Sequence, residues 1–301
     1  MKALIAEYTM HHDPGLAPEG KAMYDVLSGS FTRCGYEVVS PGPGQFSEEI
    51  AKLAPRCDVG LVIAPDNLLS RFTLAMETVT HNLGCGSMNV AVCANKQHAG
   101  KILASHGIPV PETVTKGRKV VKPVSGCGAL GVRITEEPAG DGEFGQEFIE
   151  GEHFSVSIVA GRLVGEACLY YTGAPSAALA LNRQYIEVNG DGRFHYRGGE
   201  TPAHHPREKE IVDTALQSIT VLGCQGYAGV DLVVADKVYV VDVNPRITTS
   251  IVGITATMEE EIADILVRAS KGEPPENLHF KGTVSFDATG RIITKTKKTD
   301  S

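Results

Sequence analysis

The stretch from 226 to 250, GYAGVDLVVADKVYVVDVNPRITTS, constrains the fold of this chain more than any other segment. Two runs rich in Val, Leu and Tyr flank the polar pair Asp236–Lys237, a pattern that predicts a β-hairpin with a two-residue loop. Counting outward from that loop places Asp231 opposite Asp242. Asn244 follows one pleat further along the same face. We therefore expect three oxygen-bearing side chains to gather on one face of the hairpin.

This face of the hairpin favours a bound cation. Opposed carboxylates roughly 5 Å apart repel each other, so the pairing of Asp231 with Asp242 makes sense mainly with a cation between them. Hard oxygen ligands with no Cys or His nearby indicate Mg²⁺. Arg246, two residues after Asn244, carries a guanidinium fork suited to a phosphate. The alternative interpretation is a solvent-facing hairpin with scattered acids.

Length and composition indicate a globular protein of two or three lobes. The chain has 301 residues, of which 21% are charged and 42% hydrophobic, and this length exceeds one ordinary compact core. A net charge of −8 argues against a nucleic-acid partner. No apolar run reaches about 18 residues and Met1 leads straight into a strand-like segment, so we expect a cytoplasmic protein with no membrane partner. The last residues, TKTKKTDS, predict a frayed basic tail.

Seven cysteines are scattered along the chain. Their number is odd and they form no Cys-x-x-Cys pair, which argues against disulfides and structural zinc. We interpret most of them, including Cys127 in a glycine-rich segment, as small apolar or tolerated residues.

The N-terminal segment alternates between strand and helix patterns. Strands are predicted at 2–7, 36–40 and 58–65, with helices at 19–35 and 47–53. This alternation implies a parallel sheet with helices on its faces. Ligands of such sheets lie at the carboxyl ends of strands, here at Pro65–Asp66. Residues 9–20 are expected to form a long loop, in which His11 and His12 make a solvated turn rather than a metal site.

A glycine-rich loop follows in the middle of the chain. A boundary is expected near 92–96, and a helix at 95–107 has Asn95 as its cap and Gly107 as its end. The strand beginning at Lys119 then runs into glycines at 126, 128 and 131. Glycines let backbone N–H groups cradle a phosphate, and Lys122 adds a point charge. A simple hairpin turn is the alternative, and no Walker A motif is present.

The remaining segments are less distinctive. The run 143–171 predicts a strand, a turn at Glu150–Gly151 and a pair of further strands. QEFIEGEH within it is either a sheet edge or a hinge that meets a purine, with Glu152 or His153 at a ribose. Residues 172–205 are expected to form an ordered loop over a site. Helices are predicted at 207–223 and 257–272, and an edge strand at 279–287.

Four separate motifs share the order and spacing of one known superfamily. They are Lys96, Lys122 with its glycine loop, QEFIEGEH at 146–153, and GVDLVV with YVVDVNPR. Together, from Asn95 to Ser250, they resemble the ATP-grasp superfamily. The resemblance implies an α/β and α+β fold, in which a Rossmann-like N-terminal (pre-ATP-grasp) lobe precedes a two-lobed ATP-grasp fold. The implied domains are 1–93, 94–149 (small lobe), 150–290 (C-terminal lobe) and a flexible tail, 291–301.

The same resemblance implies the residues that contact ATP. Phosphates would meet two lysines, a mobile loop would cover them, and a hinge would hold the nucleoside. The two lysines are Lys96 and Lys122, and the loop carries Ser125, Gly126, Gly128 and Gly131. The hinge places Gln146, Glu147, Phe148 and Ile149 at the adenine, and Glu152 or His153 at the ribose. His153 stands where some relatives carry Glu.

It also implies the metal site and the transferring phosphate. Asp231, Asp242 and Asn244 would bind Mg²⁺, for which Mn²⁺ can substitute. Arg246, with Lys122, would steady the transferring phosphate as a catalytic group. The position of Asp242 is usually Glu in the superfamily, and the shorter acid leaves the metal shell tighter or more hydrated.

Within the superfamily, three N-terminal motifs are most similar to the archaeal tyramine–L-glutamate ligases of methanofuran biosynthesis. They are EY at 7–8, APEGKAM at 17–23 and LVIAPDN at 61–67. This resemblance implies an ATP-dependent ligase that joins a small carboxylate and an amine through an acyl phosphate, with the glutamate side chain and tyramine as substrates. The alternatives are a ligase for another amino acid or peptide, and a non-catalytic nucleotide-binding module.

This substrate pair needs charged contacts of both signs. Arg183 and Arg197 are the candidates for the α-carboxylate of the amino acid. Glu7 and Glu19 are the candidates for an ammonium group, since they lie where the leading lobe should face the cleft. The resemblance leaves a homodimer as one possible assembly.

Overall fold

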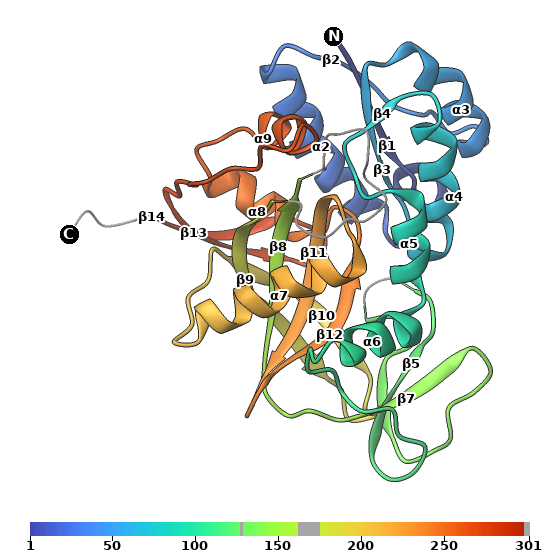
Figure 1. Cartoon of the computed structure of the whole chain (residues 1–301), viewed down its shortest axis with the longest axis vertical. Coiled ribbons are helices and arrows are strands. Elements are labelled where there is room, and N and C mark those ends of the chain that lie inside the picture. The colour runs from blue at the N-terminus through green and yellow to red at the C-terminus, as the bar shows by residue number, and fades with distance from the viewer. Residues whose placement is uncertain (127–128, 162–174, 298–301) are drawn as a thin grey trace.

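The computed structural model describes residues 1–126, 129–161 and 175–297. Within these residues the strands form three sheets, one for each successive part of the chain (Figure 1). Cys127 and Gly128 of the predicted phosphate loop lie outside the described residues. So do 162–174, which include the predicted partner of the strand before Ala160.

The first sheet is the predicted parallel sheet. Its order is β2-β1-β3-β4 and all its described pairings are parallel. The strands are β1 (Lys2–Glu7), β2 (Glu37–Val39), β3 (Val59–Ile63) and β4 (His81–Asn82). The helices of this part are α1 (Thr9–His12), α2 (Ala17–Arg33), α3 (Phe46–Leu53), a 3₁₀ turn (Ala54–Arg56), α4 (Asp66–Glu77) and α5 (Ser87–Ala94).

Three of these helices were not expected from the sequence. The predicted loop at 9–20 contains α1 and the start of α2, whose first turn holds Pro18 in the position that tolerates proline. The chain after the third strand contains α4 and α5. Asp66 stands in the first turn of α4, where an acid complements the helix dipole.

The second sheet is small and antiparallel, with the order β6-β5-β7. It consists of β5 (Lys119–Pro123), β6 (Arg133–Thr135) and β7 (Glu143–Glu147). Before it comes α6 (Lys96–Ser105), and the Asn95 side chain caps this helix by accepting from His98 N at 2.9 Å, as predicted. Gly107 ends this segment with a positive φ of 78°.

The third sheet has seven strands in the order β12-β11-β8-β9-β10-β13-β14. Its strands are β8 (Glu152–Ala160), β9 (Ser176–Val188), β10 (Phe194–Thr201), β11 (Gly226–Val234), β12 (Val238–Asn244), β13 (Gly282–Asp287) and β14 (Ile292–Lys297). Three helices accompany it, α7 (Glu208–Leu222), α8 (Ser250–Thr257) and α9 (Ile262–Ala269). The predicted apolar face of α7 is buried in the core with strands of this sheet.

The hairpin of β11 and β12 keeps the expected pairing by a different route. Val234 pairs with Val238, so the turn has three residues, Ala235–Lys237, and the predicted two-residue loop is wrong. A bulge at Val241 then shifts the register by one, and Asp231 faces Asp242 after all. A bulge adds one residue to one strand and re-aims the side chains beyond it.

Three further predictions are corrected by the third sheet. The expected loop at 172–205 is, from 176 on, largely the antiparallel pair β9 and β10. The strand predicted at the sheet edge is β13, which pairs on both sides because Ile292–Lys297 of the expected tail forms β14. The last predicted helix starts at Ile262, because the chain from Ser250 to Thr257 forms a separate helix, α8.

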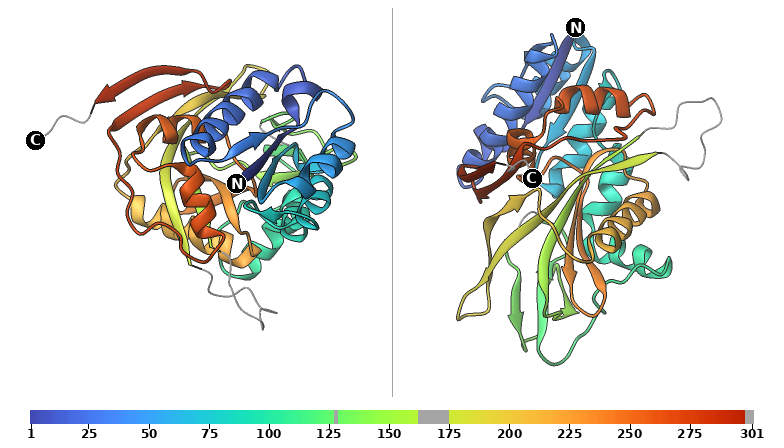
Figure 2. Two further views of the ribbon diagram at one scale, coloured as in Figure 1. Left: turned by 90° about the horizontal axis from the view of Figure 1, so that it is seen from above. Right: turned by 90° about the vertical axis from the view of Figure 1, so that its left-hand side faces the viewer.

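The N-terminal sheet and the seven-stranded sheet share their buried core. One apolar cluster contains Leu4 and Phe72 of the first part together with Phe154 and Val230 of the third. Helix α2 packs against α8 and α9, near the top in Figure 1. The small sheet lies at the opposite end of the molecule, next to the seven-stranded sheet (Figures 1 and 2).

Candidate active site

A cleft of about 740 Å³ lies where the three parts of the chain meet. Residues of β5 and β7 line one side, and residues of β8, β10, β11 and β12 line the other. The carboxyl end of β1, the start of α2 and the residues after β3 complete it. The end of β3 is the position at which the sequence predicts ligands in a parallel sheet.

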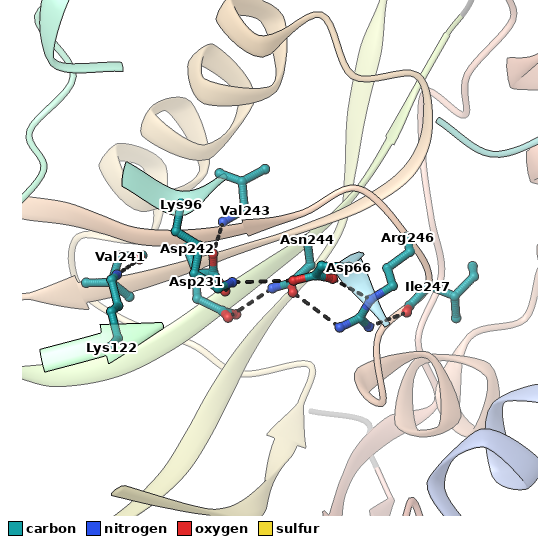
Figure 3. Close-up of polar contacts among 10 residues, drawn as sticks. All are labelled: Asp66, Lys96, Lys122, Asp231, Val241, Asp242, Val243, Asn244, Arg246 and Ile247. Atoms are coloured by element: carbon teal, nitrogen blue, oxygen red, sulfur yellow. Dashed lines mark hydrogen bonds and ion pairs between the residues drawn. The ribbon is translucent and has the colours of Figure 1, made fainter. Parts of the chain in front are cut away.

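The charged centre of the cleft is a chain of ion pairs from distant segments (Figure 3). Lys96 Nζ lies 2.5 Å from Asp242 Oδ2 and 3.5 Å from Asp66 Oδ2. Asp66 also accepts from Arg246 Nε at 3.2 Å. Burial alone would lower the pKa of Lys96, but the charges of Asp242 and Asp66 outweigh it and raise the pKa. Lys96 is therefore held as a cation.

The hairpin contributes the second part of this centre. Asp231 accepts from Asn244 Nδ2 at 3.1 Å and from Gln184 Nε2 of β9 at 2.9 Å. Burial, and next the charge of Asp242, raise the pKa of Asp231 to about 7. Burial acts in the same direction on Asp242, but Lys96 and then Lys122 overcome it and lower that pKa. The pKa values of the two opposed acids are thus shifted in opposite directions.

Lys122 is anchored by the bulge in β12. Its Nζ donates to the carbonyl of Val241, the bulged residue, at 2.7 Å. Burial lowers the pKa of Lys122 to about 8. The lysine of the small sheet therefore reaches the hairpin of the large sheet and bridges the two walls of the cleft.

The donor set of the hairpin fits a hard divalent cation. Within the residues described, no three His, Cys, Asp or Glu residues form a metal-binding group; the predicted set has two carboxylates and one amide. Asp231 and Asp242 lie opposite each other, and Lys96, Gln184 and Asn244 supply the positive or donor groups that compensate them here. Such a sparse oxygen set suits Mg²⁺, which keeps several non-protein ligands.

Most of the predicted nucleotide contacts line this cleft. They are Lys96, Lys122, Gly126, Gly131, Gln146, Glu147, Phe148, Ile149 and His153. Ser125 is described but does not line it, and Gly128 lies outside the described residues. Glu152 is also absent from the lining, since it accepts from Arg183 Nη1 at 2.9 Å on the exposed side of the sheet. Of the two ribose candidates, only His153 faces the cleft.

Of the four predicted substrate contacts, two line the cleft and two do not. Glu7 and Glu19 line the cleft, whereas Arg183 and Arg197 do not. Arg183 pairs with Glu152, and Arg197 pairs with Glu187 at 2.6 Å. Both arginines point away because the predicted loop is a strand pair, in which alternate side chains face opposite sides. The structure thus brings neither arginine into the cleft.

Glu7 and Glu19 have different surroundings. Glu7 is 1% exposed and accepts from Thr9 N, Thr9 Oγ1 and Met10 N at 3.0, 2.6 and 2.7 Å. Burial raises its pKa despite these bonds. Glu19 accepts from Thr249 Oγ1 through Oε1. Glu7 is committed to the first turn of α1, whereas Glu19 keeps Oε2 for other contacts.

Sequence reasoning placed Asp66 at a strand end without giving it a role, and it missed Gln184 and Tyr196. Asp66 joins Lys96 to Arg246, Gln184 positions Asp231, and Tyr196 of β10 faces the cleft. Burial, followed by the charges of Glu19 and Asp231, raises the pKa of Tyr196. Side chains alternate between the two faces of β9. Gln184 and Ile186 line the cleft, whereas Arg183, Tyr185 and Glu187 do not. This period of two is the signal that could have revealed the strand.

Comparison with known proteins decides the family of this chain. The model of the ATP-grasp domain family matches residues 93–250. The chain belongs to the ATP-grasp family. Two curated relatives are named tyramine–L-glutamate ligase. The one from Methanocaldococcus fervens is 32% identical over 222 residues, which is 72% of this chain and 68% of the relative. The one from Methanocaldococcus jannaschii is 28% identical over 92% of this chain and 91% of the relative.

Solved structures agree with this family. An ATP-grasp superfamily protein from Archaeoglobus fulgidus has a TM-score of 0.76 and 28% identity, covering 95% of this chain and 92% of its own. An L-amino acid ligase from Bacillus licheniformis has a TM-score of 0.69 at 16% identity, with 95% and 79% covered. The MgADP complex of a Hydrogenobacter thermophilus biotin carboxylase domain scores 0.70 at 13% identity, with 94% and 73% covered. The last two show the fold alone.

The predicted two-lobed ATP-grasp fold behind a Rossmann-like lobe is thereby confirmed, and the protein is an ATP-grasp ligase. No helix in the described ranges is long and apolar enough to cross a membrane.

Proposed function

We propose that this ligase joins the side-chain carboxylate of glutamate to the amine of tyramine, with ATP converted to ADP and phosphate. One observation carries the proposal. Lys96, Lys122, Arg246 and the oxygen-bearing face of the hairpin converge on one cleft, in a chain whose curated relatives are named for this substrate pair. The reaction would belong to methanofuran biosynthesis, as the N-terminal motifs imply.

The nucleoside would occupy the end of the cleft between the small sheet and β8. Apolar residues line this end, among them Val120, Ile149 and Val233. Gln146 to Ile149 carry the backbone groups for the adenine edge. His153 is the contact we assign to the ribose, because it lines the cleft and Glu152 does not. Gly126 and Gly131, from the loop after β5, would cover the phosphates.

The phosphates would meet the charged centre. Asp231, Asp242 and Asn244 would hold Mg²⁺, or Mn²⁺ in its place, and the ion would neutralise charge on the phosphate oxygens. Lys96 and Lys122 approach the same place from α6 and β5. Arg246 is already oriented by Asp66, and its guanidinium would contact the transferring group.

The chemistry follows from what these groups stabilise. A glutamate carboxylate oxygen attacks the γ-phosphorus, the bond to the bridging oxygen of ADP breaks, and an acyl phosphate forms. The deprotonated amine then attacks the acyl carbon, the carbon–oxygen bond to phosphate breaks, and one proton of the nitrogen passes to the released phosphate. Lys122 and Arg246 balance the negative charge that moves onto the phosphoryl oxygens. The enclosed cleft keeps water from the acyl phosphate.

We place the amine at the end of the cleft beside the N-terminal lobe. Glu19 offers a carboxylate to an ammonium group, and Tyr196 and Thr249 lie beside it. Leu16 and Met23 give this end apolar walls for an aromatic ring. Glu7 is the weaker choice, because Thr9 and Met10 already occupy its carboxylate oxygens.

The domain limits 1–93, 94–149 and 150–290 remain our proposal as well. They fit the succession of the three sheets. Both substrates are small molecules, and a homodimer is compatible with this arrangement.

Mass spectrometry tests the proposal. The purified protein is incubated with ATP, Mg²⁺, tyramine and glutamate labelled with ¹⁸O in the side-chain carboxylate. We expect the γ-glutamyl amide of tyramine together with one ¹⁸O atom in the released phosphate. Omitting tyramine should remove the amide. Turnover with a different acid or amine, and none with this pair, would refute the substrate assignment and keep the ligase class. Amide without label in phosphate would refute the acyl phosphate.

A further inference from the structure

The tip of the β9–β10 hairpin, residues 189–193, reaches across the cleft to the small sheet. Ile134 N donates to the carbonyl of Gly192 at 2.8 Å, and Phe194 N donates to the carbonyl of Val132 at 3.1 Å. These bonds flank an antiparallel bridge between Arg133 and Arg193. In Figure 2, right, the yellow hairpin descends beside the green strands of the small sheet. The tip thus joins the two walls on the side away from Lys122.

Gly192 makes this close contact possible. Its φ is +81°, and a Cβ at this position would lie 2.4 Å from the carbonyl oxygen of Ile134. The tip is itself folded, since Gly192 N donates to Asn189 O at 2.8 Å and Asn189 N donates to Arg193 O at 2.9 Å. The contact therefore requires glycine for both its backbone conformation and its lack of a side chain.

The bridge sets two arginines directly opposite each other. Arg133 and Arg193 form a pair without mutual backbone hydrogen bonds, in which Cβ atoms stand about 4.5–5.5 Å apart on one face. Both side chains line the cleft. Like charges in this position destabilise a strand pair. Glu143 and Asp191 offset part of this repulsion, and an anionic ligand lying over both arginine side chains would offset more of it.

The present partners of the two arginines leave room for such a ligand. Arg133 is held by Glu143 in a forked pair at 2.6 and 2.8 Å. Arg193 pairs with Asp191 of the same tip at 3.2 Å, and the two side chains are 69% and 58% exposed. An exposed ion pair of this kind contributes little, so Arg193 can exchange its partner at small cost.

We propose that Arg133 and Arg193 form an anion-binding site shared by the two walls of the cleft, and that the bound anion holds the tip of the hairpin against β6. The anion is a phosphate group of the nucleotide or a carboxylate group of the acid substrate. The identity of these ligands rests on the proposed function, whereas the contact itself does not. The site couples ligand binding to closure of the cleft.

Hydrogen exchange at two amides tests the coupling. The Ile134 and Phe194 N–H groups make the bridging bonds, so their exchange reports the contact directly. The protein is measured alone, with MgATP, and with glutamate, without any amine. Slower exchange with MgATP supports a phosphate as the anion, and slower exchange with glutamate alone supports a carboxylate. Unchanged exchange at both amides with either ligand overturns the proposal.

Substitutions separate the charge from the backbone contact. Arg193→Gln should weaken binding of the ligand that slows exchange by about tenfold, the usual scale for one charge-assisted contact. Arg268→Gln is the control, since this arginine is 54% exposed, has an exposed acidic partner and lies on α9 away from the cleft. Equal affinities of the two variants would overturn the anion site.

Gly192→Ala tests the close approach, with Gly190→Ala as its matched control. A Cβ at 190 would have no atom within 4 Å, so only the first substitution should speed exchange of the Ile134 and Phe194 amides and raise the Kd of the same ligand. Equal exchange rates and equal Kd values for both variants would overturn the proposed contact between the hairpin tip and β6. Slower exchange with MgATP, without formation of the glutamate–tyramine amide, would refute the substrates and leave the proposed contact of the hairpin tip with β6 intact. Formation of the glutamate–tyramine product without slower exchange at Ile134 and Phe194 would support the substrates and refute the contact between the hairpin tip and β6.

Discussion

The seven-stranded sheet meets its two neighbours in different ways. Towards the N-terminal lobe the junction is a continuous apolar core, in which Leu27 of α2 and Ile251 of α8 are both fully buried. Ser30 Oγ adds a bond to Glu261 at 2.7 Å. Towards the small sheet lies the cleft, crossed by polar contacts such as Lys122 to Val241 and by the hairpin tip. The first junction resists opening, and the second can open at the cost of a few hydrogen bonds.

This difference assigns the parts of the site to a fixed and a movable unit. Asp66, Asp231, Asp242 and Arg246 all stand on the unit that contains the N-terminal lobe and the large sheet. Lys122 and the proposed nucleoside contacts, 146–149, come from the small sheet or the segment just after it. The shared core thus fixes the side chains proposed to hold phosphate and metal, while the small sheet proposed to cover the nucleotide can move for entry and release.

The largest expected effect comes from breaking the fixed part of the site. Asp242→Asn should reduce ADP formation by about 10³-fold or more, because it removes the charge that faces Lys96 and the proposed Mg²⁺. The variant should stay folded by circular dichroism. Asp236→Asn, in the exposed turn of the same hairpin, is the control and should keep near-normal turnover. Substantial activity of Asp242→Asn at saturating Mg²⁺ would remove this residue from the metal site.

Arg246→Lys should be the next most damaging change. The guanidinium contacts Asp66 through Nε and the Ile247 carbonyl through Nη1, both within 3.2 Å, and an ammonium cannot serve several directions from one plane. We expect kcat to fall by about 10²-fold with little change in the KM for ATP. Steady-state ADP release measures both constants. A wild-type kcat would exclude contact between Arg246 and the transferring phosphate.

Stability should show the contrast between the junctions. Leu27→Ala removes a fully buried side chain from the shared core and should cost about 2–5 kcal/mol of unfolding free energy. Ile293→Ala, on a side chain that is 61% exposed in β14, should change it by less than about 0.5 kcal/mol. Urea denaturation of both variants gives the comparison. Similar midpoints would mean that α2 is not part of a common core.

Sequence patterns predicted the regular parts of this molecule. The parallel sheet, α6 with its Asn95 cap, and α7 follow from periodicity and capping alone. Asp231 and Asp242 were paired correctly, although the loop and the bulge at Val241 were not foreseen. The two errors cancelled, because one extra turn residue and one bulged residue shift the register by the same amount. Hydrophobic pattern fixes which face is buried but not where an extra residue is accommodated.

The remaining errors arise where tertiary contacts replace local signals. Arg183 and Arg197 were placed in a loop over the site because the segment is rich in polar residues. Four of those polar side chains, Gln184, Arg193, His195 and Tyr196, line the cleft, and in a sequence they cannot be told from surface residues. Asp66 could be placed at a strand end, but its role depends on Lys96 and Arg246, which are 30 and 180 positions away. No local pattern contains such pairings.

The smallest expected effect tests whether the small sheet opens by itself. The Arg133 guanidinium lowers the pKa of Glu143 to about 2, from an ordinary value of 4.5. A depressed pKa means that the stabilisation is present above the ordinary value and is lost as the pH falls towards 2. The pair lies near the surface, so its contribution is at most about 1 kcal/mol. Glu143→Gln should therefore speed hydrogen exchange in β5–β7 slightly at pH 7.

Lowering the pH should reduce this difference between the variant and the wild type, because Glu143 gains a proton in both the opened and the closed state. Exchange in β11 and β12 of the fixed unit should be equal in the two proteins at every pH. If Glu143→Gln speeds exchange in β11 and β12 as much as in β5–β7, then the small sheet and the fixed unit open together. In that case the contrast between the two junctions would not extend to their dynamics. The small sheet would then have no independent motion for the hairpin tip to restrain.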